Sequence, residues 1–158
     1  MEVELPDAEA TRSFGAAIGA QVRAGDLVVL SGPLGAGKTT LTQGLGEALG
    51  IRGRVTSPTF VIARVHPSLT DGPDLVHVDA YRLGGPVEVD DLDLDTPLAR
   101  AVVVVEWGEG KVEQLTEERL EVRLDRALGD ADEVRHATVI GHGPRGEELA
   151  AALRDWQT

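Results

Sequence analysis

Apolar residues recur along much of this chain at the spacing of an amphipathic helix. Phe14, Ile18 and Val22 fall on one side of a helix, while Asp7 stands at a capping position before them and Gly25 at a stopping position after them. Two further segments repeat this spacing. The pattern predicts helices at residues 7–24, 40–49 (with Leu41, Leu45, Ala48 and Leu49 inward) and 145–156 (with Leu149 and Leu153 inward).

Shorter apolar or alternating runs predict strands at residues 27–30, 61–66, 75–81, 101–105, 119–124 and 134–140. The run from Ala101 to Val105 is unbroken, which is typical of a strand covered on both faces in a mostly parallel sheet. Pro and Gly between residues 67 and 74 predict that the second and third strands form an antiparallel hairpin. The alternation in residues 119–124 and the strand at 134–140 predict an antiparallel edge.

Between the first buried strand and the helix at residues 40–49, the chain reads Gly-Pro-Leu-Gly-Ala-Gly-Lys-Thr, from Gly32 to Thr39. This is a complete phosphate-binding loop in the strand–loop–helix setting that it requires. Its glycines let backbone N–H groups turn toward phosphates, Lys38 adds a positive charge and the Thr39 hydroxyl can bind Mg²⁺. The predicted nucleotide contacts in this segment are Gly32, Leu34, Gly35, Ala36, Gly37, Lys38, Thr39 and Thr40.

These elements together predict an α/β fold of the phosphate-loop NTPase type. We expect a three-layer sandwich with a mostly parallel central sheet, an antiparallel hairpin and edge, and helices on both faces. With 158 residues, 42% of them hydrophobic, the chain has the size of one domain, so residues 1–158 are expected to form a single unit.

Two acidic residues end apolar strands. Glu106 follows the valine run and Asp79 follows Leu-Val-His-Val, and ligands of open α/β sheets bind beyond the carboxyl ends of strands. We expect Glu106 to contact a metal ion or its water, and Asp79 to order the attacking water or to hold Mg²⁺ through its hydration shell; the two roles can be exchanged. His77 shares a strand face with Asp79 and is expected to be a neutral, packed histidine.

A third polar segment, Ser57-Pro58-Thr59-Phe60, falls between the helix at residues 40–49 and the next strand. Phosphate-loop switch proteins carry a hydroxyl that senses the γ-phosphate at this position, so Thr59 is a catalytic candidate beside the alternative of an ordinary Ser-Pro turn. Three of the five aromatic residues, Phe60, Tyr81 and Trp107, lie within two residues of Thr59, Asp79 or Glu106. This spacing suggests a shared aromatic wall, with core packing the default for Phe60.

The composition limits the partners. A formal net charge of −12 disfavours direct, stable binding to nucleic acid, and Arg52, Arg54 and Arg64 are expected to be solvated surface. No cysteine is present, so disulfides and thiolate sites are excluded. No apolar run reaches about 18 residues and the N-terminus is acidic, so we expect a cytoplasmic protein without membrane contact. The chain has no Asn and hence no usual guanine-reading segment, which favours ATP.

Four segments taken together resemble the TsaE (formerly YjeE) family over roughly residues 5–125. They are Leu-Gly-Ala-Gly-Lys-Thr-Thr at 34–40, Ser-Pro-Thr-Phe at 57–60, His-Val-Asp-Ala-Tyr-Arg at 77–82 and Val-Glu-Trp at 105–107. The resemblance implies a small bacterial ATPase that works with the TsaB and TsaD proteins in making threonylcarbamoyladenosine beside the tRNA anticodon. Its ATP hydrolysis is expected to reset that complex, and tRNA would be held mainly by the partners.

The resemblance also assigns residues. It implies that Thr39 and Glu106 contact Mg²⁺, that Asp79, Tyr81 and Arg82 border the nucleotide, and that Trp107 matters for activity. The chain departs from the family at Ala80, where a bulky apolar residue is common. A late arginine near the nucleotide has only Arg135 as a candidate counterpart.

Two other functions stay open. A small-molecule kinase would share the phosphate loop, but no Arg-rich lid follows it and residues 90–95 are acidic. A nucleotide-dependent switch would bind its partner in one nucleotide state with negligible hydrolysis. The expected ATPase is weak alone, because no arginine finger or general base is obvious.

Overall fold

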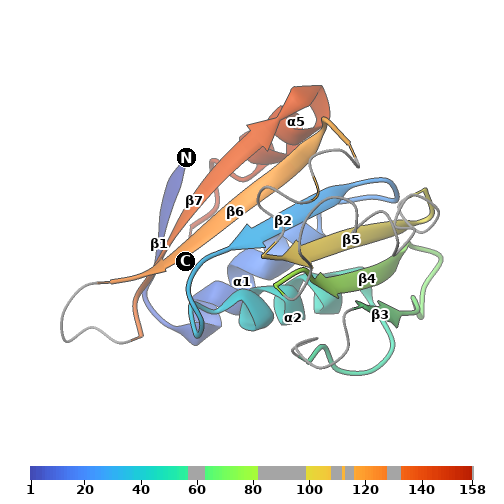
Figure 1. Ribbon diagram of the computed structural model, residues 1–158, viewed down its shortest axis with the longest axis horizontal. Coiled ribbons are helices and arrows are strands. Elements are labelled where there is room, and N and C mark those ends of the chain that lie inside the picture. The colour runs from blue at the N-terminus through green and yellow to red at the C-terminus, as the bar shows by residue number, and fades with distance from the viewer. Residues whose placement is uncertain (57–62, 82–98, 108–111, 113–115, 128–132, 158) are drawn as a thin grey trace.

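The computed structural model describes residues 1–56, 63–81, 99–107, 112, 116–127 and 133–157, and these form a seven-stranded sheet with helices packed against it (Figure 1). In chain order the elements are β1 (Glu2–Leu5), α1 (Ala8–Gly19), β2 (Leu27–Ser31), α2 (Lys38–Leu49), β3 (Ala63–His66), β4 (Asp74–Asp79), β5 (Ala101–Glu106), β6 (Arg119–Arg126), β7 (Arg135–His142) and α5 (Gly143–Ala152).

The strand order is β1-β7-β6-β2-β5-β4-β3, with a parallel centre and antiparallel edges. Strand β2 pairs in parallel with β5 and β6, and β5 pairs in parallel with β4. The β3–β4 hairpin closes one side, and β6, β7 and β1 form antiparallel pairs on the other. The predicted α/β class, hairpin and antiparallel edge are therefore confirmed.

The valine run forms the centre of the sheet, as predicted. Every residue of β5 is buried, because apolar groups cover both faces of the strand. On one face Val102 and Val104 join a cluster that includes residues of α1, α2 and α5. On the other, Val103 and Val105 pack with residues of β2, β4 and Val112. All described helices lie on the first face. The acidic residues 90–95 lie outside the described residues.

Helix α1 begins as predicted but ends earlier. The Asp7 carboxylate accepts a hydrogen bond of 2.8 Å from the Ala10 N–H, which confirms the cap. The helix ends at Gly19 rather than at residue 24, because the N–H groups of Gln21 and Val22 both bond to the Ile18 carbonyl and the chain turns toward β2. Helix α5 likewise ends at Ala152 rather than at 156, although Leu149 and Leu153 are buried as expected.

Helices α1 and α2 cross with their backbones in close contact. A Cβ atom added to Gly15 would lie 1.9 Å from the Leu41 carbonyl oxygen, and one added to Gly44 would lie 1.9 Å from that of Arg12. Only glycine fits at these positions. The crossing buries Leu41, Leu45 and Leu49 but leaves Ala48 exposed, so the prediction that Ala48 faces inward is wrong.

Two features near the chain ends differ from the prediction. Strand β1 is formed by Glu2–Leu5, which pair with β7 and place only every second side chain toward the core. Strand β7 continues past the predicted end at residue 140, because Gly141 and His142 pair with Leu120 and Arg119 of β6. None of the described helices combines the length and apolar character that crossing a membrane requires.

Candidate nucleotide-binding site

The phosphate-loop sequence connects the end of β2 to the start of α2, at the carboxyl end of the parallel strands (Figure 1). Gly32 has a φ of 137°, and a Cβ there would lie 2.1 Å from the Leu124 carbonyl oxygen, so β6 leaves room only for glycine. The loop turns there and enters α2 at Lys38. The first N–H groups of a helix lack helical partners, so this helix end can bind an anion.

Lys38 is 6% exposed and lies against the loop that precedes it. Its Nζ donates to the Gly32 and Pro33 carbonyls, at 2.8 and 3.0 Å, and stands 4.2 Å from the centre of the Trp107 ring. Burial lowers the pKa of Lys38 from its ordinary value, and the negative charges of Glu106 and Asp79 partly oppose that shift.

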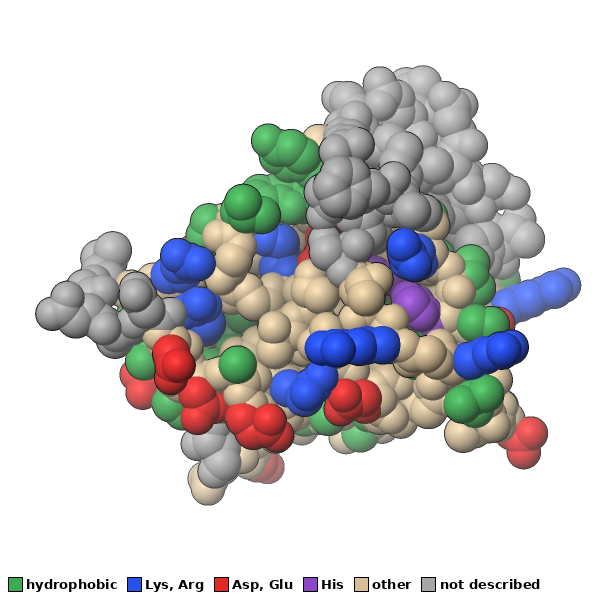
Figure 2. All heavy atoms as spheres, turned by 90° about the horizontal axis from the view of Figure 1, so that it is seen from below, with side chains coloured by type: hydrophobic (Ala, Val, Ile, Leu, Met, Phe, Trp, Pro, Cys, Tyr) green, Lys and Arg blue, Asp and Glu red, His purple; other side chains and the backbone are tan. Residues whose placement is uncertain are grey.

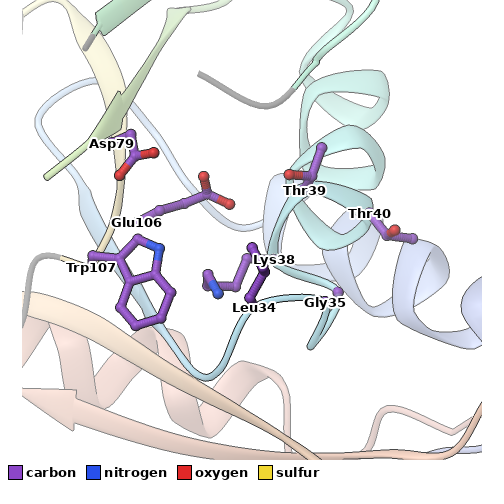
Figure 3. A pocket seen from close by; sticks show the side chains of 9 residues that line it. Leu34, Gly35, Lys38, Thr39, Thr40, Asp79, Glu106 and Trp107 are labelled. Carbon is purple, nitrogen blue, oxygen red and sulfur yellow. The ribbon is translucent and has the colours of Figure 1, made fainter. Parts of the chain in front are cut away.

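The two strand-end carboxylates are neighbours across the sheet. Asp79 and Glu106 are paired residues at the ends of β4 and β5, and both are buried. An oxygen of Asp79 accepts a hydrogen bond of 2.9 Å from the Tyr81 N–H, which fixes that carboxylate. Figure 3 shows both carboxylates facing the cavity in front of α2, with Glu106 directed toward Thr39 and Lys38. His77, on the same face of β4, is fully buried, as a packed histidine would be.

The donor set of this cavity suits a magnesium ion. Thr39, Asp79 and Glu106 offer hydroxyl and carboxylate oxygens, which are the ligands that Mg²⁺ prefers beside phosphate oxygens and water. Within the described residues, no group of three or more His, Asp and Glu side chains could hold a metal ion unaided.

Trp107 directly follows Glu106 and has an unusual backbone. Its φ is 61°, in the left-handed region that residues other than glycine rarely adopt, and its N–H donates to the Leu30 carbonyl at 2.9 Å. This conformation directs the indole toward Lys38 (Figure 3). The Tyr81 ring lies 5.2 Å from it, centre to centre, and Tyr81 is 66% exposed. The aromatic wall predicted beside the carboxylates therefore includes Tyr81 and Trp107.

Most predicted site residues meet around one cavity of about 230 Å³. Its lining comprises Leu34, Gly35, Gly37, Lys38, Thr39, Thr40, Asp79, Glu106 and Trp107. Ala36 instead packs in the core, and its N–H donates to the Pro33 carbonyl. Gly32 lies behind the cavity as an acceptor for Lys38. Ser57 to Phe60, with the catalytic candidate Thr59, and Arg82 lie outside the described residues.

Two arginines contact the phosphate loop from the far ends of β6 and β7. Arg126 donates to the Gly35 carbonyl through Nε and Nη2, and Arg135 donates to it through Nη2, each at 3.3 Å. Arg135 also lines a second cavity of about 180 Å³, with Ala8, Thr11, Gly35, Gly37, Thr40 and Glu133. Sequence reasoning named Arg135 but missed Arg126, whose place depends on the β6–β7 pairing, with Arg126 opposite Arg135.

Arg52, Arg54 and Arg64 are all exposed to solvent. On the face shown in Figure 2, Lys and Arg side chains are spread across the surface, with Asp and Glu side chains along one margin, rather than gathered in one positive field. This distribution agrees with an ordinary solvated surface.

Comparison with known proteins identifies the family to which this chain is similar. The family model described as "Threonylcarbamoyl adenosine biosynthesis protein TsaE" matches residues 5–135. A tRNA threonylcarbamoyladenosine biosynthesis protein TsaE from Streptomyces coelicolor is 71% identical over 136 residues, which cover 85% of this chain and 92% of that protein. The Bacillus subtilis protein of the same name is 40% identical over 147 residues, covering 92% and 88%.

A solved structure agrees with the sequence comparisons. The crystal structure of Bacillus subtilis YdiB superposes with a TM-score of 0.75 at 34% identity, covering 97% of this chain and 93% of that one. The phosphate loop, the paired strand-end carboxylates and the neighbouring tryptophan all lie within the residues that the family model matches. This chain belongs to the TsaE family.

Proposed function

We propose that this chain is a Mg²⁺-dependent ATPase that acts with TsaB and TsaD in the threonylcarbamoyladenosine modification of tRNA. The observation that carries the proposal is a single cavity in which the phosphate loop, Lys38 and Thr39 face the two carboxylates Asp79 and Glu106. Phosphoryl transfer to water needs these parts: a cradle for the phosphates, oxygen ligands for a metal ion and a carboxylate near the attacking water. The pathway is taken from the names of the relatives, which are tRNA threonylcarbamoyladenosine biosynthesis proteins.

The two adjoining cavities have room for a whole nucleotide, not only for its phosphates. They share Gly35, Gly37 and Thr40, so they meet at the phosphate loop. We infer that the terminal phosphates lie in the first cavity and the nucleoside in the second, between α1 and the start of β7. The missing guanine-reading segment favours adenine as the base.

Each residue then has a defined task. Lys38 would exchange its carbonyl partners for phosphate oxygens, since charge-assisted hydrogen bonds are stronger than neutral ones. Thr39 and Glu106 would hold the magnesium ion, whose positive charge stabilises charge developing on the phosphates. Asp79, fixed by the Tyr81 N–H, would orient the attacking water. We expect slow turnover without partners, which fits a resetting role in the complex.

Calorimetry and phosphate-release assays test the proposal. The chain should bind ATP with Mg²⁺ and prefer it to GTP, and adding TsaB and TsaD should raise the rate of phosphate release. Glu106→Gln should retain ATP binding but hydrolyse it about 100-fold more slowly, as expected when a catalytic carboxylate is lost.

The matched control is Glu121→Gln, which alters a buried carboxylate of β6 outside the first cavity and should keep the wild-type rate. An absence of ATP binding, or equal rates with and without the partners, would contradict the proposal. Phosphorylation of a nucleoside or another small alcohol would instead favour the kinase.

A further inference from the structure

His77 is a buried polar side chain without a hydrogen-bond partner in the part of the chain that the structure describes. Its exposed fraction is 0%, and neither Nδ1 nor Nε2 has a partner there. It interrupts the otherwise apolar Leu75–Val78 segment of β4, where leucine or valine would avoid the cost of burying an unpaired imidazole. Such a residue calls for an explanation other than packing.

The Glu106 carboxylate lies close to this side chain. The Nε2 atom of His77 lies 3.5 Å from Oε2 of Glu106, slightly beyond an ordinary hydrogen bond. A small rotation of either side chain would close this gap, and hydrogen bonds in empty catalytic sites often shorten when the ligand arrives. The side chain of Glu106 is itself only 4% exposed, so few water molecules can reach that carboxylate to hydrogen-bond with it in place of His77.

The arrangement of the strands fixes this pair. His77 and Glu106 lie on adjacent parallel strands, with Asp79 as the paired residue of Glu106 and His77 two residues earlier on the same face. His77 therefore stands behind the carboxylates, as seen from the cavity, and does not line it. A contact from this side leaves the other Glu106 oxygen free to face Thr39 and the cavity (Figure 3).

We propose that His77 is a positioning residue that donates from Nε2–H to Glu106 Oε2 and so holds the Glu106 carboxylate in the orientation that binds magnesium. The inference rests on the proposed function, because it assigns His77 to the metal-binding carboxylate of that site. Residues behind the direct ligands of a metal commonly set ligand orientation, and their loss weakens metal affinity about 10- to 100-fold.

Three substitutions of His77 test whether it acts as a hydrogen-bond donor or only fills space in the core. The amide nitrogen of Gln reaches roughly as far as Nε2, whereas that of Asn reaches only as far as Nδ1, and Leu supplies no donor. ATP binding is measured by calorimetry across a series of MgCl₂ concentrations, and unfolding is followed by heating. We expect His77→Leu and His77→Asn to raise the half-saturating Mg²⁺ concentration about 10-fold and His77→Gln to stay within about threefold of wild type.

Stability provides a second readout. Because Leu removes an unpaired buried imidazole, His77→Leu should unfold at a temperature equal to or above that of the wild type while requiring more Mg²⁺. His66→Leu is the matched control, since His66 is also buried with an unpartnered Nε2 but makes no contact with Glu106 among the described residues. It should leave the Mg²⁺ dependence unchanged.

A double substitution tests whether the effect passes through Glu106. In a Glu106→Gln background, His77→Leu should have no further effect on the Mg²⁺ dependence. Unchanged Mg²⁺ dependence in His77→Leu, or equal losses in the Gln and Asn variants, would overturn the inference. If Leu is not tolerated, the comparison of Gln with Asn decides alone. A wild-type chain that binds no ATP would instead refute the proposed function.

Discussion

Lys38 and Trp107 form a contact that nucleotide binding should break. The Lys38 ammonium lies 4.2 Å from the centre of the indole ring and donates to two loop carbonyls. A cation–π contact contributes about 0.5–2 kcal/mol, and a triphosphate offers several negative oxygens to the same ammonium. We therefore expect the phosphate to displace the indole as the partner of Lys38.

The fluorescence of Trp107 should report this change. A Trp156→Phe variant leaves Trp107 as the only tryptophan, and saturating it with Mg²⁺ and ADP should alter its emission intensity, because the charge beside the ring moves. The converse variant, Trp107→Phe, retains Trp156 packed against Phe14 and should give a constant signal. An unchanged Trp107 spectrum under conditions where calorimetry detects binding would show that the Lys38 ammonium keeps its contact with the indole ring.

His66 should make stability depend on pH. Burial lowers the pKa of His66 from its ordinary value of 6.5, and His77 on β4 and Arg64 on β3 lower it further. The unfolded chain then takes up a proton at a higher pH than the folded chain does. Stability is thus greatest above pH 6.5 with respect to this group, and falls as the pH drops from 6.5 toward the lowered pKa.

Urea unfolding between pH 7.5 and pH 5 tests this dependence. The midpoint for His66→Leu should fall less over this range than that of the wild type. Replacing the exposed His136 of β7 by Leu should leave the wild-type decline in place. Parallel pH profiles for wild type and His66→Leu would mean that other groups cause the decline.

At the scale of elements, the contact between α1 and α2 connects stability to the site. Gly15 lies against the carbonyl of Leu41, one turn into the helix that carries Lys38 and Thr39 at its start. A side chain at this crossing must push the helices apart. Since α2 begins at the phosphate loop, a shift of this helix would also displace the groups that face the phosphates.

Gly15→Ala should therefore destabilise the protein although alanine favours helix formation by about 1 kcal/mol. Overpacking typically costs about 1–3 kcal/mol, and a rigid backbone carbonyl 1.9 Å away cannot yield as a side chain can. We expect a lower free energy of unfolding in urea and weaker ATP binding. Gly46→Ala should lower the free energy of unfolding less, since a Cβ atom at Gly46 would first meet the flexible end of the Ile51 side chain. Gly15→Ala equal to wild type would mean that the helices separate at no cost.

Local sequence patterns predicted the elements whose own residues carry the signal, such as an apolar run or a capping residue. The valine run of β5 and the Asp7 cap of α1 are such cases. The missed elements depend on distant partners: β1 has only four residues, alternates Glu with apolar residues, and becomes a strand by pairing with β7. The end of α1 depends on the turn toward β2, where Gln21 and Val22 bond to the Ile18 carbonyl.

The site divides in the same way. The phosphate loop and the two strand-end carboxylates could be predicted, because a motif fixes the first and the direction of parallel strands fixes the second. Arg126 and the contact between His77 and Glu106 could not, because each joins residues from elements whose pairing no local pattern reveals. Thr59 and Arg82 stay predictions.

At the scale of the whole molecule, the net charge opposes direct binding to tRNA. The chain carries 27 acidic and 15 basic residues, and the arginines at positions 52, 54 and 64 are exposed to solvent. Stable binding to nucleic acid requires several phosphates to be neutralised together. A net charge of −12 opposes this over the whole surface.

We therefore expect no retention of tRNA by the isolated chain in a filter-binding assay at about 150 mM salt, where electrostatic binding is already weakened. Retention should appear when TsaB and TsaD are added, because those partners would supply the contacts. Any retention at low salt should disappear when Arg52, Arg54 and Arg64 are all replaced by Ser, while Arg154→Ser, at an exposed site near the C-terminus, should have little effect. Partner-independent retention that survives both physiological salt and the triple substitution would show that this acidic protein has a tRNA site of its own.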